Sequence, residues 1–174
     1  MNVPVRLGYD FYNRPVVEVA QDLLGKKLVW GSFEGIITET EAYAGVDDAA
    51  SHAARGLTPC SKIMFGPPGH VYVYLIYGMY HCLNIVTEAP GQPSAVLIRG
   101  IKSIHVHLDG PSKICRYLGI STTHNNLDLV TSQDTYLTQG IIPKKYITTP
   151  RIGIKKATDK LWRFIIPPEE IENF

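Results

Sequence analysis

The chain has 174 residues, 45% of them apolar and 19% charged, and a formal net charge of +1, so we predict a single packed domain over residues 1–174. No apolar run approaches the roughly 18–20 residues of a membrane span, and the first residues lack the apolar core of a signal peptide, which predicts a soluble cytoplasmic protein. Cys60, Cys82 and Cys115 are odd in number and widely spaced. This pattern indicates reduced thiols and argues against a disulfide framework, an iron–sulfur cluster or a metal site.

The first elements in the chain are a helix and a β-hairpin. The helix begins near Pro15 and ends at Gly25, because apolar residues recur between them at helical spacing. Residues 27–30 and 36–43 read as two strands joined by a turn. The helix offers packing and no chemistry, so the hairpin is the first place to look for a site.

The second of these strands carries two carboxylates on one face. Alternation places Glu39, Glu41 and Tyr43 on the same face as Ile37, and Ala42 on the opposite one. A buried face tolerates carboxylates only when they are paired, hydrogen-bonded or used in chemistry, so we expect a cleft here. Periodicity does not choose between Glu39 and Glu41, and either acid can instead be a salt-bridged structural group.

A second hairpin follows a loop in which a short helical turn carries His52. Residues 70–76 and 80–86 read as its strands, with the chain reversal near Tyr77 and Gly78. Tyr77 and Met79 then lie at the hairpin tip, where large apolar side chains have little core to join. Their position favours a wedge or an interface.

The rest of the chain adds short elements. A strand over residues 94–99 ends in Arg99, a helix spans 111–118, and strands are expected within 146–154 and 161–166. Residues 125–140 read as a polar loop and 167–174 as a frayed tail. Strands outnumber helices and most are linked by hairpins, so we predict an α+β fold with a curved, mainly antiparallel sheet, partly open and barrel-like.

Basic residues concentrate near the C-terminus. Residues 144–163 contain seven Lys and Arg and a single acid, Asp159. Such an excess can attract a phosphate backbone, although a run of charge is more often a solvated face. We keep both interpretations.

The residue types that remain for chemistry are carboxylates, histidine, arginine and aromatic rings. Glycine-rich phosphate loops, GxSxG elbows and HExxH pairs are absent from the sequence. A carboxylate can deprotonate water and stabilise an oxocarbenium-like transition state, and aromatic rings can sandwich a flat, electron-poor base. The set suits hydrolysis at a sugar carbon.

Several long, ordered motifs carry a family resemblance. They read ETEAYxGxxDxASHxxRGxTP from Glu39, then MFGPPGHVYVYLIYGMYHCLN, VLIRG and GPSK, with a thinner match at PRIGI. The chain in this respect closely resembles the alkyladenine (3-methyladenine) DNA glycosylases. That family is made of single-domain, metal-free enzymes, so the resemblance implies no cofactor and a monomer.

The resemblance implies a role for each matched residue. Glu41 matches the general base for the attacking water, and Arg99 with the backbone carbonyl of Ile152 matches the groups that hold this water. Tyr43 and His52 match one wall of the pocket for the flipped base and Tyr74 the other. Asn84 is the remaining pocket residue, and it matches the residue that discriminates against the exocyclic amine of guanine.

The resemblance also implies a DNA-binding surface. Tyr77 matches the side chain that replaces the flipped nucleotide, with Met79 beside it in the minor groove and Lys113 on a phosphate. Arg151, in the basic segment, is expected to contact DNA as well. Two departures bear on this surface: Cys60 and Ser61 follow Thr-Pro where relatives carry Arg-Asn, and the segment 100–109 is short.

These features lead to the hypothesis of a monofunctional DNA glycosylase in base excision repair, without AP-lyase activity. Its expected partner is duplex DNA that contains an alkylated or deaminated purine, such as 3-methyladenine, 7-methylguanine or hypoxanthine. Structural alternatives stay open: Tyr43 and Tyr74 as core residues, His52 as a hydrogen-bonding group, and Arg99 as the counterion of a buried acid. A non-catalytic module that stacks single-stranded bases is the competing functional hypothesis.

Overall fold

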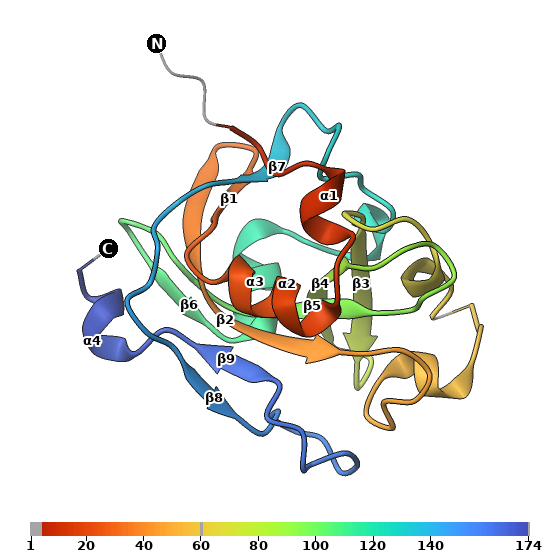
Figure 1. Cartoon of the computed structure of the whole chain (residues 1–174). Helices are drawn as coiled ribbons and strands as arrows, with labels where there is room; N and C mark the ends of the chain where they lie inside the picture. Colours follow the sequence, from red (N-terminus) through yellow and green to blue (C-terminus); the bar gives the residue numbers. More distant parts are fainter. Residues whose placement is uncertain (1–4, 60, 174) are drawn as a thin grey trace.

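A computed structural model describes residues 5–59 and 61–173 (Figure 1). Its elements, in chain order, are α1 (Tyr9–Tyr12), α2 (Val16–Leu23), β1 (Lys27–Trp30), β2 (Phe33–Tyr43), η1 (His52–Arg55), η2 (Lys62–Phe65), β3 (Val71–Ile76), β4 (Tyr80–Val86), β5 (Ala95–Lys102), β6 (His107–Asp109), α3 (Pro111–Leu118), η3 (Thr122–His124), β7 (Thr135–Thr138), β8 (Ile147–Thr149), β9 (Arg163–Ile165) and α4 (Pro168–Ile171). The expectations for Cys60 lie outside the described residues. Cys82 and Cys115 are buried free thiols.

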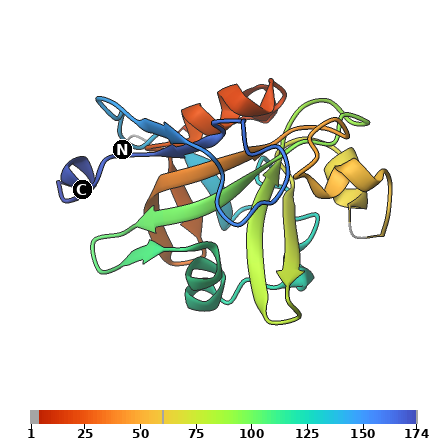
Figure 2. The same cartoon turned by 90° about the horizontal axis from the view of Figure 1, so that it is seen from below.

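The strands form one curled antiparallel sheet. Its order is β3-β4-β5-β2-β1-β7, while β6 pairs with β5 and β9 pairs with both β2 and β8. Because β1 pairs only with the first part of β2, β9 can take its place beside the second part, and the sheet curls into a half-open barrel (Figures 1 and 2). This confirms the predicted α+β class with a curved, mainly antiparallel sheet.

The most important local irregularity lies where β2 meets β5. The pairing shifts between Ile37 and Thr40, opposite Arg99 and Gly100. A Cβ at Gly100 would lie 2.5 Å from the Thr38 hydroxyl, so only glycine fits this crossing. The shift turns Ile37 into the core beside Ala42, which corrects the prediction that these two residues lie on opposite faces.

The core lies between this sheet and the helices α1, α2 and α3. The predicted helix after Pro15 is confirmed as α2, and its apolar stripe is buried. The Thr40 hydroxyl donates to the carbonyl of Ala20 at 2.8 Å, which ties α2 to β2. One face of β2 is therefore fixed to the core, and its other face is left for the carboxylates.

Two predictions for the C-terminal half are wrong. The expected loop 125–140 contains β7, which pairs along the whole of β1, because a four-residue strand in a polar surrounding gives almost no periodic signal. The expected frayed tail contains α4, whose Ile171 is only 7% exposed. Burial of one isoleucine anchors this turn.

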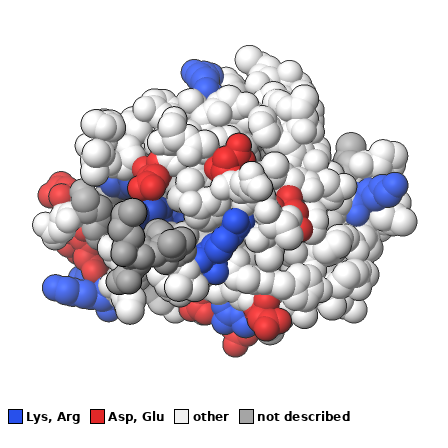
Figure 3. Space-filling view, turned by 90° about the horizontal axis from the view of Figure 1, so that it is seen from above, with Lys and Arg blue, Asp and Glu red and all other residues white. Residues whose placement is uncertain are grey.

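Charge on one face of the molecule is sparse. Figure 3 shows the face seen from above, with a few Lys, Arg, Asp and Glu side chains interspersed among uncharged ones. This face therefore offers no continuous positive surface. Among the described residues, no helix combines the length and apolar composition needed to cross a bilayer.

Candidate active site

Glu41 lies in the middle of β2, with its side chain fully buried. The Tyr43 hydroxyl donates to its Oε1 at 2.9 Å, and the backbone N–H of Ile152 donates to its Oε2 at 2.7 Å. The Arg99 Nη1 atom lies 3.7 Å from Oε1. Burial raises the pKa of Glu41, and these three partners, Arg99 foremost, oppose that rise.

Glu39 differs from Glu41 in being a salt-bridged acid. It accepts from Arg99 Nε at 2.9 Å and from Arg163 Nε at 3.0 Å, both on Oε2, and from Arg163 Nη2 at 3.2 Å on Oε1. Its side chain is 20% exposed. Alternation along the strand does not distinguish Glu39 from Glu41, but their surroundings do. Of the two acids, only Glu41 is closed off from solvent.

The register of the sheet brings the site residues into one row. Glu41 pairs with Leu97, Leu97 with Asn84, and Asn84 with Tyr72 across β2, β5, β4 and β3. Directly paired residues of antiparallel strands share a face, so these side chains lie side by side. The Asn84 side-chain N–H group donates to the carbonyls of Tyr72 and Cys82.

A cavity of about 460 Å³ opens above this row, a size typical of ligand pockets. Its lining includes residues from β2, β3, β4, β5, η1, the β3–β4 turn and the loop between β8 and β9: Tyr43, His52, Tyr74, Tyr77, Asn84, Arg99 and Ile152. The structure therefore brings together all the predicted pocket residues and, at the rim, the hairpin-tip tyrosine. Glu41 lies just behind this wall, in contact with Tyr43, Arg99 and Ile152.

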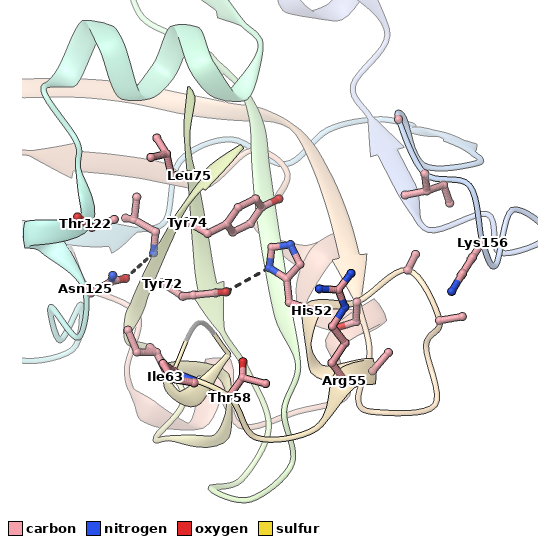
Figure 4. A pocket seen from close by; sticks show the side chains of 18 of the residues that line it. His52, Arg55, Thr58, Ile63, Tyr72, Tyr74, Leu75, Thr122, Asn125 and Lys156 are labelled. Atoms are coloured by element: carbon pink, nitrogen blue, oxygen red, sulfur yellow. Dashed lines mark hydrogen bonds between the residues drawn. The ribbon is translucent and has the colours of Figure 1, made fainter. Parts of the chain in front are cut away.

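The aromatic rings are arranged differently from the expected sandwich. His52 and Tyr74 pack edge to face with centroids 4.2 Å apart, and His52 Nδ1 lies 3.1 Å from the Tyr72 hydroxyl (Figure 4). A flat ring between two others needs about 7 Å, twice the contact distance. His52 thus belongs to the same wall as Tyr74, and not to the opposite one with Tyr43.

Burial sets the protonation of these side chains. It raises the pKa of Tyr43 and of Tyr74, with the nearby Glu41 adding to the effect, so both phenols stay protonated. Burial, helped by Arg55, lowers the pKa of His52, which keeps its imidazole neutral at pH 7. The rings that line the cavity are therefore neutral, and the charged groups at it are Arg99, which lines it, and the buried Glu41 behind its wall.

A second, open groove of about 1000 Å³ adjoins the cavity and shares His52, Tyr72 and Tyr74 with it. Among the residues that the structure describes, its lining contains three cations, Arg55, Lys155 and Lys156, and no Asp or Glu. Figure 4 shows Arg55 and Lys156 on the same side of His52. The groove is therefore positively charged, unlike the face in Figure 3.

Arg151 is buried, with only 4% of its surface exposed. Its Nη1 and Nη2 atoms both donate to the Asp48 carboxylate, and Nη1 also donates to the carbonyl of Ala42. Its guanidinium stacks on the rings of Tyr43 and Trp162 at 4.7 and 5.2 Å. This burial conflicts with the expectation that Arg151 contacts DNA: a run of basic residues does not reveal which of them turns inward.

The hairpin tip projects from the sheet on the same side as α3 (Figure 2). Tyr77 is 88% exposed and Met79 67%. Met79 N–H donates to the carbonyl of Ile76, and Tyr77 and Gly78 both have positive φ, 54° and 65°. Lys113, on α3, is exposed and forms an ion pair with Asp109 at 2.7 Å.

Three contributors were not identified from the sequence: Asp48, Tyr72 and Arg163. Tyr72 had a signal, since alternation places it on the same face as Tyr74. Arg163 had none, because its partner Glu39 is 124 residues away and no local pattern connects them. Among the described residues, no group of three or more His, Cys, Asp or Glu side chains is placed to hold a metal ion.

Comparison with known proteins places these residues in context. The profile of the family described as methylpurine-DNA glycosylase (MPG) matches residues 10–170. A protein of Wolbachia sp. subsp. Brugia malayi is 53% identical over 163 residues, covering 92% of this chain and 96% of its own. A protein of Rickettsia felis is 49% identical over 169 residues, covering 95% and 96%. Both are named, provisionally, as 3-methyladenine DNA glycosylases.

Proposed function

The chain belongs to the methylpurine-DNA glycosylase family, and from this premise we propose that it excises alkylated or deaminated purines from duplex DNA in base excision repair. The substrates would include 3-methyladenine, 7-methylguanine and hypoxanthine. The observation that carries the proposal is the buried Glu41 carboxylate behind an aromatic cavity, with Arg99 beside it. The enzyme acts as a monomer and needs no metal or cofactor.

The reaction proceeds by hydrolysis of the N-glycosidic bond. Glu41 takes a proton from water, the water oxygen bonds to C1′, and the bonding electrons leave with the base. Arg99 opposes the burial-driven rise in the pKa of Glu41 and so favours the ionised base. A cationic base such as 3-methyladenine leaves readily, whereas neutral hypoxanthine must gain a proton as it departs.

The resemblance implies a role for the backbone carbonyl of Ile152, and we add one for its backbone N–H. Its backbone N–H, 2.7 Å from Glu41 Oε2, orients the carboxylate, and its carbonyl remains available to the water. Oε1 faces both the Tyr43 hydroxyl and Arg99. The attacking water would therefore approach on the Arg99 side of the carboxylate.

DNA would lie over the hairpin tip and the adjoining groove. Tyr77 fills the gap left by the flipped nucleotide, Met79 lies beside it, and Lys113 contacts a phosphate. Arg55 and Lys156 in the groove suit the phosphates of the flipped strand because no acid lines it. His52 and Tyr74 form the wall on which the base stacks, facing Tyr43, while Asn84 at the base of the cavity tests for the guanine amine.

Chromatographic detection of free purine tests the proposal. Duplexes that contain hypoxanthine or 3-methyladenine should release the free base, and undamaged duplex should release none. A module that only stacks exposed bases should bind single strands better than duplex and release nothing. That outcome would replace the enzymatic proposal with the competing one.

Replacing Tyr77 by asparagine is expected to increase the free energy of unfolding and, at the same time, to impair base flipping. Asparagine tolerates positive φ better than tyrosine, so the variant should gain up to about 1 kcal/mol in the free energy of unfolding. It loses the ring that fills the vacated stack, so excision of hypoxanthine from duplex should slow at least about tenfold, because unstacking costs a few kcal/mol.

Urea denaturation and single-turnover excision measure the two effects of Tyr77→Asn. Excision from a single-stranded oligonucleotide, where no gap must be filled, serves as the control and should change little. Equal slowing on single and double strands would contradict the wedge role.

No covalent intermediate with DNA is expected. Among the described residues that line the cavity there is no lysine, and Lys155 and Lys156 line only the adjoining groove. An attacking amine would be needed for a Schiff base and for strand cleavage. Borohydride treatment during turnover should trap no protein–DNA adduct, and a trapped adduct would contradict the monofunctional mechanism.

A further inference from the structure

Arg99 stands between two carboxylates and contacts them unequally. Its Nε atom donates to Glu39 Oε2 at 2.9 Å, a hydrogen bond with good geometry. Its Nη1 atom lies 3.7 Å from Glu41 Oε1, which is too long for a hydrogen bond. The guanidinium is therefore anchored on Glu39 and only faces Glu41.

Glu39 is itself fixed from the other side by β9. Arg163 donates to both of its oxygens, with Nε on Oε2 at 3.0 Å and Nη2 on Oε1 at 3.2 Å. The remaining Nη1 atom of Arg163 donates to the Thr149 hydroxyl on β8 at 3.2 Å. Because a guanidinium is planar and rigid, two contacts of this kind leave little freedom to either partner.

We propose that Glu39, held by Arg163, is a positioning residue that keeps the Arg99 guanidinium facing Glu41 without letting it close into an ion pair. The inference rests on the proposed function of Glu41 as the base. It assigns Glu39 and Arg163, which lie outside the cavity wall, an effect on the reaction that passes through Arg99.

The physical reason is competition between two acids for one cation. If Glu39 lost its charge, the nearest carboxylate for Arg99 would be that of Glu41. A close pair would make this carboxylate a weaker base and would occupy the oxygen that must receive the proton of water. The open arrangement leaves Glu41 a stronger base than a close pair would and keeps it accessible on the Arg99 side.

The pH dependence of base release reports on this arrangement, because the base must be ionised. The charged and titratable groups that act on Glu41 come from β2, β3, β4, β5 and β9, and they are Tyr43, Tyr74, Cys82, Arg99 and Arg163. Tyr43, Tyr74 and Cys82 all have a raised pKa and stay neutral across the acid range. The acid limb of the profile therefore follows Glu41 and its two arginines.

Glu39→Gln is the direct test, measured by single-turnover excision of hypoxanthine from pH 4 to 9. We expect the acid limb to move to lower pH and the plateau rate to fall by up to about 100-fold, the effect of misplacing a reacting group by about 1 Å. Arg163→Gln should move the limb the other way, because it removes a cation that itself lowers the pKa of Glu41 and leaves Glu39 free to draw Arg99 away. Glu34→Gln, an exposed acid on the same strand, is the matched control and should leave the profile unchanged.

A double substitution separates positioning from a purely structural role. If Glu39 acts through Arg99, adding Glu39→Gln to Arg99→Met should slow the reaction no further. A loss of equal size in both backgrounds, or a lower melting temperature with an unchanged pH profile, would overturn the inference. Failure of the wild-type protein to release any base would instead overturn the proposed function, so the two failures are distinguishable.

Discussion

Glu41→Gln is expected to bind a damaged duplex with nearly the wild-type Kd and to release base about 10²–10⁴-fold more slowly, the range for removal of a general base. The amide keeps the shape of the side chain. Its oxygen can accept from Ile152 N–H, and its N–H group can donate to the Tyr43 hydroxyl, which then turns its own proton away. The fold should therefore survive the change.

Three measurements test the prediction for Glu41→Gln. Single-turnover excision gives the rate, fluorescence anisotropy with a hypoxanthine duplex gives Kd, and thermal unfolding checks the fold. Because the substitution removes a buried charge, the melting temperature should not fall. Glu34→Gln serves again as the control for loss of an acid on β2. An active Glu41→Gln enzyme would exclude Glu41 as the base.

Arg151→Met is expected to lower the free energy of unfolding by about 3–5 kcal/mol, the usual result of leaving one partner of a buried ion pair alone. Both side chains of the Asp48–Arg151 pair are almost fully buried. The Asp48 carboxylate also accepts from the backbone N–H groups of Ala44 and Ala50. Without the arginine, the buried Asp48 carboxylate, which holds the loop after β2, would therefore lose its counterion.

Urea denaturation of three variants tests this prediction. Adding Asp48→Asn to Arg151→Met should recover part of the loss, because no unpaired charge remains. Arg14→Met, which breaks an exposed pair with Asp22, should cost less than about 1 kcal/mol. A loss of that small size for Arg151→Met would mean that the buried pair contributes little.

The same pair is expected to matter for the site. Arg151 precedes Ile152, whose N–H reaches Glu41, and its guanidinium backs the Tyr43 ring. A side chain expected on the DNA surface thus supports the cavity from behind. Sequence alone could not separate these roles, since burial depends on the contacts that Arg151 and Ile152 make with the end of β2.

Local patterns predicted the parts of the site that depend on neighbours in the chain. Alternation and the turn signal at Gly78 place Tyr77 at an exposed tip, and the same alternation puts Tyr72 and Tyr74 together. Patterns failed where distant strands decide the geometry. The shift opposite Gly100 reverses the side of Ile37, and the partners of Glu39 lie on β5 and β9.

Fold class was predictable because it depends on the number and type of elements. The short strand β7 was not, since four residues carry too little periodicity to define a strand, whereas β8 and β9 lie within the predicted ranges 146–154 and 161–166 and are shorter than these. The stacking geometry of His52 also escaped prediction. It depends on how η1 packs against β3, which no spacing encodes.

Glu41 lies on a strand that is paired on both sides, whereas the entrance of the cavity in front of it is formed by segments outside the sheet. At Glu41, β2 pairs with β5 on one side and β9 on the other, whereas His52 begins the short helical turn η1 and Ile152 lies in a loop. A combinatorial library restricted to residues 53–59 and 153–156 would therefore vary the entrance without disturbing the ladder that holds the acid. Directed evolution toward other damaged bases could therefore vary these two segments and leave β2 unchanged.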